Sequence, residues 1–392
     1  MSQKHLFLST GAAGAVLMLV LTGCATKGGQ VGPVTGSATH RGNLQRTGHY
    51  PGPGPREITD TVLTVTRPGK LGFGAGTASP AIVNGIAYFG GADSCVHAAD
   101  IKSGRLVWSV PLFPGPYGLG ATPAVASGGL YCGGMDSLFR ALDARTGKER
   151  WRFRTGGEIL SAPAVTDGLV LFGSNDNSLY ALDMGTGEEK WRCVTGGDVT
   201  SSPAVADGAV YFGSYDSCLY AVGEKTGTVM WTFRAGGIVE GGPAVSDRKV
   251  YFGSADRHIY ALAADSGRLL WSYPTDSAVV VGPAIADGVV YCGGYDGRLY
   301  ALEAETGKEM WRFQTPSRIM SAPSVAGGVV YFGSMDKALY AVATETGKEL
   351  WRYETGAFPV VCSPVVVDGV VYFGHLSCPK PGLKPGALIG LK

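Results

Sequence analysis

The stretch WRFRTGGEILSAPAVTDGLVLFGSNDNSLYALDMGTGEEK, residues 151–190, decides the fold, because the same pattern begins again at Trp191. The tryptophans are spaced by 43 residues once and then by 40 residues five times. A period near 40 indicates a repeat architecture, in which each repeat is one supersecondary unit. The tryptophans that mark the repeats are Trp108, Trp151, Trp191, Trp231, Trp271, Trp311 and Trp351.

One repeat contains the pattern of four short strands. Residues 151–154 alternate aromatic and basic side chains, which is typical of a half-buried strand. Asp167-Gly168 lies between two apolar runs and predicts a tight hairpin, because this dipeptide tolerates positive φ. A strand at Leu179–Leu182 completes the unit. We call the strands A (at the proline), B (at Phe-Gly), C (at Tyr-Ala) and D (at the tryptophan), and together they predict one blade of a propeller.

The strand A proline occurs eight times, so the sequence predicts eight blades. The last blade ends after its strand C, at Leu388–Leu391, and therefore lacks a strand D. Residues 63–69 align with residues 151–157 and can supply that strand. The predicted fold is an all-β, eight-bladed propeller of four-stranded antiparallel blades, with its ring closed by an N-terminal strand. The eight prolines are Pro80, Pro123, Pro163, Pro203, Pro243, Pro283, Pro323 and Pro364.

The first residues have the anatomy of an export signal. An apolar run from Leu6 to Leu21 is too short for a membrane span, which needs about 20 residues. It ends in Leu21-Thr22-Gly23-Cys24, which resembles the lipobox of bacterial lipoproteins. That resemblance implies cleavage before Cys24 and acylation of this cysteine, with an ordinary secretory signal as the alternative. Ala25 follows, where an aspartate would imply retention in the inner membrane, so the resemblance implies the outer membrane.

Three segments follow from these patterns. Residues 1–23 are the lipoprotein signal peptide, residues 24–56 are the lipidated cysteine and a flexible tether, and residues 57–392 are the propeller. Within the second segment, residues 39–48 resemble the stretch that introduces quinoprotein-like propellers.

The charge of the exported chain limits its partners. Removing residues 1–23 takes away one lysine and leaves 32 basic and 32 acidic side chains. Nucleic-acid affinity comes largely from Lys and Arg that neutralise phosphates, so a nucleic-acid partner is not expected. Polybasic attachment to a membrane surface is not expected either.

The turn before the tryptophan carries a family resemblance. The pattern T-G-K-E-x-W, seen at residues 146–151, 306–311 and 346–351, resembles the tryptophan-docking repeat of quinoprotein alcohol dehydrogenases and their relatives. The resemblance covers residues 39–392 and includes the outer-membrane assembly lipoproteins of the BamB type. Those relatives imply a lipid-anchored propeller without a catalytic centre. A WD40 propeller is not supported, because no tryptophan is followed by Asp and no Gly-His opens a blade.

Two ring-like sets of residues have a structural and a functional interpretation. The seven tryptophans could form a stacking platform, but each occupies the same position in strand D, which predicts packing between blades. Seven aspartates after strand B could hold calcium, but one aspartate per blade is more typical of an Asx turn. These aspartates are Asp93, Asp136, Asp176, Asp216, Asp256, Asp296 and Asp336.

No cofactor, metal or catalytic residue is predicted. Quinoprotein dehydrogenases typically carry an adjacent cysteine pair and a carboxylate cluster for calcium, and no two cysteines here are adjacent. The six histidines show no metal-ligand spacing, and no Cys-x-x-Cys occurs. Cys362 and Cys378 flank strands A and B of the last blade on the same side, so an exported protein could join them in a disulfide.

The loop lengths predict where a partner binds. The spacing from strand A to B is constant, and the inserted residues fall in the D–A and B–C loops, which share one rim. Because loops on a rigid scaffold carry binding function, this rim is the predicted partner surface. Its candidate residues are Phe113, Pro114, Tyr117, Glu158, Asp198, Glu240, Arg318 and Phe358.

The sequence therefore predicts a lipid-anchored, non-enzymatic scaffold propeller with a protein partner, in line with assembly of outer-membrane β-barrel proteins. The protein would be exported and face the periplasm or the cell surface. Two alternatives stay open. One is a quinoprotein-like oxidoreductase that depends on pyrroloquinoline quinone, and the other is a cell-surface module that binds glycan or peptide.

Overall fold

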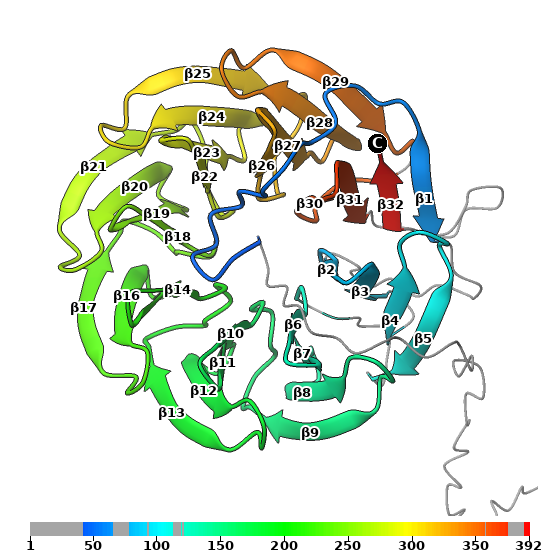
Figure 1. The fold of residues 1–392 in the computed structure, drawn as a ribbon. Helices are drawn as coiled ribbons and strands as arrows, with labels where there is room; N and C mark the ends of the chain where they lie inside the picture. The colour runs from blue at the N-terminus through cyan, green and yellow to red at the C-terminus, as the bar shows by residue number, and fades with distance from the viewer. Residues whose placement is uncertain are drawn as a thin grey trace, which may run out of the picture.

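The chain forms eight four-stranded antiparallel sheets arranged as blades around a central axis (Figure 1). The computed structural model describes residues 42–65, 78–91, 94–112, 119, 121–356, 358–374 and 388–392. The predicted eight-bladed, all-β propeller is confirmed. Among the described residues, no helix has the length and apolar character needed to cross a membrane.

The first four blades follow the chain, each from its innermost strand outward. They contain β2 (Ala81–Val83), β3 (Ile86–Gly90), β4 (Cys95–Asp100) and β5 (Leu106–Pro111); β6 (Ala124–Ala126), β7 (Gly129–Gly133), β8 (Leu138–Asp143) and β9 (Glu149–Arg154); β10 (Ala164–Thr166), β11 (Leu169–Ser174), β12 (Ser178–Asp183) and β13 (Glu189–Val194); β14 (Ala204–Ala206), β15 (Ala209–Gly213), β16 (Cys218–Gly223) and β17 (Val229–Arg234).

The next three blades repeat this arrangement, and in the last blade the outermost strand is β1 from the N-terminal part of the chain. They contain β18 (Ala244–Ser246), β19 (Lys249–Ser254), β20 (His258–Ala263) and β21 (Leu269–Pro274); β22 (Ala284–Ala286), β23 (Val289–Gly293), β24 (Arg298–Glu303) and β25 (Glu309–Gln314); β26 (Ser324–Ala326), β27 (Val329–Gly333), β28 (Ala338–Ala343) and β29 (Glu349–Glu354); β30 (Val365–Val367), β31 (Val370–Gly374), β32 (Leu388–Leu391) and β1 (Thr61–Val65).

The hydrophobic core lies between neighbouring blades. Each middle strand buries both of its faces, because a blade is covered by another blade on each side, and so β15 and β23 are buried along their whole length. The cluster that joins β22–β25 to β26–β28 combines Tyr291 and Ile319 with Phe332 and Tyr340. The outer strands alternate instead, as in β9, because one face meets solvent.

Each tryptophan joins its blade to the next one. The indole N–H of Trp271 donates to the carbonyl of Ala304 at 3.0 Å, and equivalent bonds from Trp151 and Trp231 reach Met184 and Ala264. Trp108, Trp191, Trp271 and Trp351 are buried, whereas Trp151, Trp231 and Trp311 are half-buried. These contacts are the ones that packing between blades requires, and the substitutions argued in the Discussion test that role.

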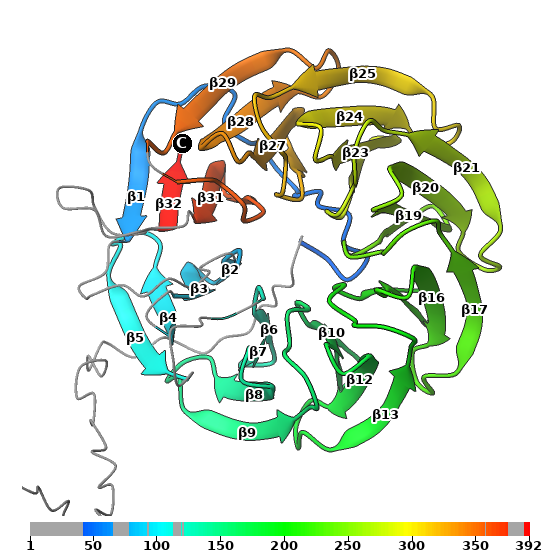
Figure 2. The same ribbon diagram turned by 180° about the vertical axis from the view of Figure 1, so that it is seen from behind.

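The N-terminal strand closes the ring as predicted. β1 is the outermost strand of the last sheet and pairs antiparallel with β32, with Leu63 opposite Gly390 (Figures 1 and 2). The backbone of Thr59 and Asp60 bonds to that of Lys392, which extends the pairing beyond the strands. The last blade thus combines the two ends of the described chain.

Pro55 completes the tryptophan contacts at this junction. Its carbonyl accepts the indole N–H of Trp351 at 3.0 Å and the hydroxyl of Tyr331 at 2.9 Å. In other blades one carbonyl of the next blade takes the same two bonds, as Ala304 does from Trp271 and Tyr251. The segment before β1 therefore substitutes for a turn of the eighth blade.

Residues 42–50 begin near the centre of the ring and follow the innermost strands of four consecutive blades (Figure 1). Backbone carbonyls of this arm accept N–H groups from strands of four consecutive blades, at Val205, Val245, Ile285 and Val325. These N–H groups lie at the inner edges of their sheets, where a buried unpaired donor would be costly. We call residues 42–50 the arm.

Arg46 anchors the arm. Its side chain is fully buried, and its guanidinium donates to the carbonyls of Pro203 at 2.5 Å and Ala162 at 2.9 Å. The sequence places residues 42–56 in a flexible tether, but the structure shows them bound to the ring. The difference arises because these residues contact strands that lie up to 296 positions away in the chain, as Pro55 does with Trp351. Such contacts leave no local pattern.

Candidate functional site

The predicted rim is built from paired loops. The backbone N–H of Asn175 donates to the carbonyl of Glu158 at 2.8 Å, and that of Tyr215 donates to the carbonyl of Asp198 at 2.9 Å. In these blades the D–A loop is thus bonded to the B–C turn that follows it, so the two loop types do share one face of the disc. Among the described candidates, Glu158 and Arg318 are exposed and Asp198 and Phe358 are half-buried. Phe113, Pro114 and Tyr117 lie outside the described residues.

The repeated aspartates hold these loops together. The carboxylate of Asp216 accepts the N–H of Cys218 at 2.9 Å, the hydroxyl of Tyr220 at 2.6 Å and the N–H of Gly196 at 2.8 Å. The first bond is that of an Asx turn, and the last reaches the preceding D–A loop. No group of three or more His, Cys, Asp or Glu side chains among the described residues is arranged to hold a metal ion. The carboxylate of Asp216 is thus directed to its own turn and to the adjoining loop. Asp93 lies outside the described residues.

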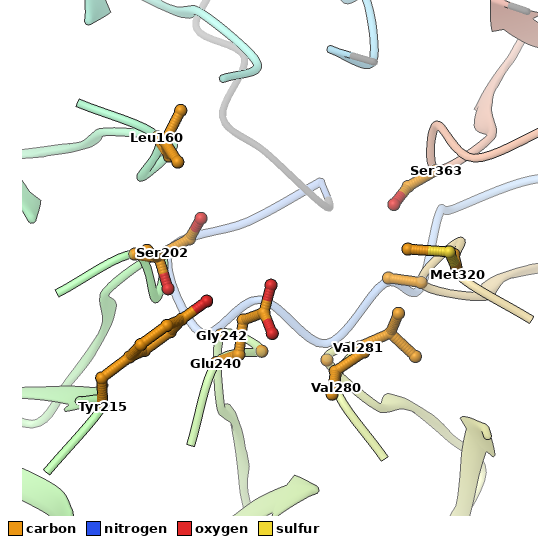
Figure 3. Close-up of a pocket in the computed structure, with 13 residues that line it drawn as sticks. Leu160, Ser202, Tyr215, Glu240, Gly242, Val280, Val281, Met320 and Ser363 are labelled. Carbon is orange, nitrogen blue, oxygen red and sulfur yellow. The ribbon is translucent and has the colours of Figure 1, made fainter. Parts of the chain in front are cut away.

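Glu240 lies apart from the other rim acids. Glu158 and Asp198 each follow their tryptophan by seven residues, whereas Glu240 follows Trp231 by nine. The two-residue offset places Glu240 in the wall of a cavity at the centre of the ring, with its carboxylate directed inward (Figure 3). The structure therefore does not bring Glu240 together with Glu158 and Asp198.

The cavity has a volume of about 350 Å³. Its wall contains five residues at the same position of successive repeats, and four of them are uncharged (Figure 3). Tyr215, Ser202 and Ser363 add hydroxyl groups. Gly241 and Gly242 allow neighbouring backbone to approach, because a Cβ atom there would lie 2.6 Å from Val281 and 2.7 Å from Ser202. The five equivalent residues are Leu160, Thr200, Glu240, Val280 and Met320.

Burial raises the pKa of the Glu240 carboxyl above its usual value, and a hydrogen bond from the Tyr215 hydroxyl offsets this in part. Burial also raises the pKa of Tyr215, and the negative charge of Glu240 adds to that effect. Among the described residues, Glu240 has no ion-pair partner. The cavity thus holds one partly desolvated carboxylate that no described cation neutralises.

A second surface lies on the circumference of the disc. Seven large hydrophobic side chains of the described residues are exposed, and five of them lie on the outermost strands of four consecutive blades, from β13 to β25 (Figure 1). We call these strands β13, β17, β21 and β25 the apolar arc. Its exposed residues are Val194 (67% exposed), Val229 (47%), Met230 (55%), Leu269 (44%) and Met310 (53%).

Charged pairs protect four of the eight outer strands but not the two in the middle of this arc. In β9, β13, β25 and β29 a glutamate two residues before the tryptophan binds an arginine one residue after it, at 2.7–2.9 Å. In β17 these positions hold Val229 and Thr232, and in β21 they hold Leu269 and Ser272. Charges on an edge strand oppose pairing with another chain, and β17 and β21 lack this protection. The same is true of β5, where these positions hold Leu106 and Ser109, and of β1.

The predicted lipidation and disulfide sites are described in part. Cys24 and Cys378 lie outside the described residues. Cys362 is buried, and its sulfur bonds to the backbone of Gly374 in β31, with distances of 3.0 Å to the nitrogen and 2.8 Å to the oxygen. The bridge from Cys362 to Cys378 stays a prediction.

The sequence profile of the family described as "Outer membrane protein assembly factor BamB" matches residues 92–201, 195–282 and 276–378, which together span most of the chain. The chain belongs to this family. This membership confirms the predicted resemblance to BamB-type propellers. A comparison with curated proteins finds no match.

Solved structures share the fold at low identity. BamB from Moraxella catarrhalis superposes with a TM-score of 0.69 at 18% identity, over 85% of this chain and 97% of that chain. The quinohemoprotein alcohol dehydrogenase ADHIIG from Pseudomonas putida HK5 gives a TM-score of 0.77 at 18% identity, over 90% and 79% of the two chains. The computationally designed protein Ika8 gives 0.72 at 20% identity, over 84% and 99%. At this identity the likeness establishes the fold alone.

The dehydrogenase likeness raises the question whether the cavity fits a quinone with calcium. Calcium takes six to eight oxygen ligands, typically with several carboxylates. Glu240 is the one carboxylate in the described cavity wall, so a calcium ion there would lack most of its ligands. Leu160, Val280 and Met320 face it with aliphatic groups. These residues do not fit such a centre.

Proposed function

We propose that the protein is a non-enzymatic scaffold propeller that is held at the outer membrane by its N-terminal lipid and docks proteins of the β-barrel assembly machinery. The observation that carries the proposal is the family match over residues 92–378, on a closed ring whose loops and outer edges are free to bind. The described cavity wall does not fit a quinone centre, which favours docking over the dehydrogenase alternative.

We place the partner on the apolar arc and on the rim loops that adjoin it. Val194 ends β13, and Asp198 lies four residues later in the loop that leaves this strand. Exposed apolar groups that are gathered on one side of a soluble molecule are typical of an interaction surface. The edges of β17 and β21 suit an extended segment of the partner, which would add a strand to the sheet by backbone hydrogen bonds.

Restoring the missing charges should block this contact. The double substitution Val229→Glu with Thr232→Arg gives β17 the pair that β25 has, and we expect loss of partner capture at unchanged thermal stability, because surface changes usually alter stability by about 0.5 kcal/mol or less. The measurement is affinity capture of the protein from its native membrane, with identification of co-purified barrel-assembly proteins and a test for quinone absorbance.

The matched control removes a pair from β29, which lies outside the apolar arc and three blades from β17. Glu349→Val with Arg352→Thr makes β29 resemble β17, and capture should be unchanged. A third variant, Glu158→Lys with Asp198→Lys, tests the rim loops separately. Capture that survives the β17 change and disappears with the rim change would move the partner site to the loops. Recovery of stoichiometric quinone would contradict the scaffold role.

The lipid anchor has its own test. Replacing Cys24 by alanine removes the thiol that acylation requires, so the protein should move from the membrane fraction to the soluble fraction. A single acyl chain binds a membrane only weakly, and stable anchoring needs more than one. Fractionation with immunoblotting measures the change. Membrane retention of the Cys24→Ala protein at the level of the parent would contradict anchoring at this residue.

A further inference from the structure

The position of Glu240 is an exception within the repeat. The equivalent residues Leu160, Thr200, Val280 and Met320 line the same cavity without charge. A carboxylate at this place loses part of its hydration, which penalises the charged form. None of the contacts described here repays that cost with an opposite charge. The folded ring therefore presents an unneutralised acid to whatever enters the cavity.

The surroundings of Glu240 define the group that would neutralise it. One carboxylate matches one positive charge, and the Tyr215, Ser202 and Ser363 hydroxyls can accept further N–H groups. The Thr200 hydroxyl lies in the same wall, next to that of Tyr215. A group with several N–H donors and a single charge satisfies this set.

The rest of the wall indicates which kind of molecule carries the positive charge. Val280, Val281 and Met320 form an aliphatic side of the cavity, and Leu160 lies across the cavity from them (Figure 3). The volume of about 350 Å³ suits a short chain of carbon atoms and is at the lower end for ligand pockets. A multivalent metal ion would leave these aliphatic groups unused and would lack ligands.

We propose that the central cavity binds an alkylammonium group, with its nitrogen at Glu240 and its aliphatic chain against Val280 and Met320. The group has two sources with the same chemistry, a free primary amine or the lysyl side chain of a protein loop. The inference concerns the cavity and does not depend on the partner surface of the apolar arc.

The test uses the full-length protein labelled with ¹³C in its methionine methyl groups. The Met320 signal is assigned by its loss in Met320→Leu, and n-butylamine, n-butanol and N-acetyl-lysine methylamide are added in turn. We expect n-butylamine to shift the Met320 signal with saturation and to bind at least about tenfold more weakly in Glu240→Gln, because tenfold corresponds to about 1.4 kcal/mol. The neutral n-butanol should produce no saturable shift.

Asp198→Asn is the matched control, because it neutralises a carboxylate of a rim loop outside the cavity wall. It should leave the binding of n-butylamine unchanged. A saturable shift with the capped lysine supports a protein side chain as the ligand, and a shift with n-butylamine alone supports a free amine. An equal response of the parent and Glu240→Gln proteins, or an equal response to n-butanol, would overturn the proposal.

A stability measurement separates binding from a structural role. A folded pKa above the unfolded value means that Glu240 stabilises the fold when protonated and that this contribution is lost as the pH rises through the folded pKa. Glu240→Leu, which copies Leu160, should therefore raise the melting temperature at pH 7. A lower melting temperature would show that Glu240 stabilises the fold. It would contradict the idea that this residue serves binding at a cost in stability.

Discussion

A protein that lacks residues 57–65 should fail to form a soluble monomer. The deletion removes β1, so β32 loses its partner from Leu388 to Leu391 and the last blade exposes an unpaired edge. Leu63, which is 3% exposed, leaves the core between the first and last blades. The deletion also shortens the segment that holds Pro55 against Trp351. An open ring with a free apolar edge is prone to pair with other molecules.

Size-exclusion chromatography and thermal unfolding followed by circular dichroism measure this result. We expect aggregates or the loss of the cooperative transition. The control is deletion of residues 25–38, the part of the predicted tether that precedes the arm, which should leave the melting temperature unchanged. A soluble monomer with the melting temperature of the parent after deletion of 57–65 would contradict ring closure by β1.

The blades could be predicted because their information is local. The Asp-Gly hairpins, the Thr-Gly turns and the alternation around each tryptophan lie within 40 residues of one another, and the period repeats them. Strand β1 could also be predicted, since its residues align with a strand D and the last blade lacked one. In each case a missing or repeated element was visible along the chain itself.

The arm could not be predicted in this way. Residues 42–50 contribute carbonyl groups to the inner strands, and every residue has a carbonyl group, so the side chains hardly specify the contact. Arg46 is fully buried, although the residue type favours a solvated position. A basic residue in a glycine-rich stretch is typical of a tether, and this local pattern concealed its place at the axis of the ring.

The cavity and the apolar arc did leave signals in the sequence. An alignment of the repeats by their tryptophans places Glu240 among Leu, Thr, Val and Met, and places Val229 and Leu269 where other repeats have glutamate. Counting acids on the rim instead grouped Glu240 with Glu158 and Asp198. In a repeat protein, a residue that differs from those at the same position of the other repeats is more informative than its charge alone. The residue type shared by most repeats already serves the fold.

The tryptophan contacts predict how much stability each tryptophan contributes, and the repeats allow buried and half-buried tryptophans to be compared. Trp271→Ala should lower the free energy of unfolding by about 3–5 kcal/mol, because it removes a large buried side chain and leaves a cavity. Trp271 packs against Tyr251 and donates to Ala304, whose carbonyl would lose this bond. Trp231→Ala should cost less, since this tryptophan is half-buried. Urea denaturation measures both values, and a loss below 1 kcal/mol for Trp271→Ala would contradict its packing role.

A double-mutant cycle with Gly307 tests the contact itself. Gly307 has φ +73°, and a Cβ atom there would lie 2.6 Å from the Trp271 ring, so Gly307→Ala combines backbone strain with a steric clash. In the Trp271→Ala background the clash is gone and the strain of about 1–2 kcal/mol stays.

The cost of Gly307→Ala should therefore be smaller in the Trp271→Ala background, with a coupling energy of about 0.5–3 kcal/mol, as for residues in contact. Gly288 of the same blade is the control, because it has φ +75° and no atom within 4 Å of such a Cβ. Gly288→Ala should cost the same in both backgrounds, since its strain is independent of Trp271. Equal costs of Gly307→Ala in the two backgrounds would show that the indole does not rest on this turn, and packing between blades would then have to depend on other contacts.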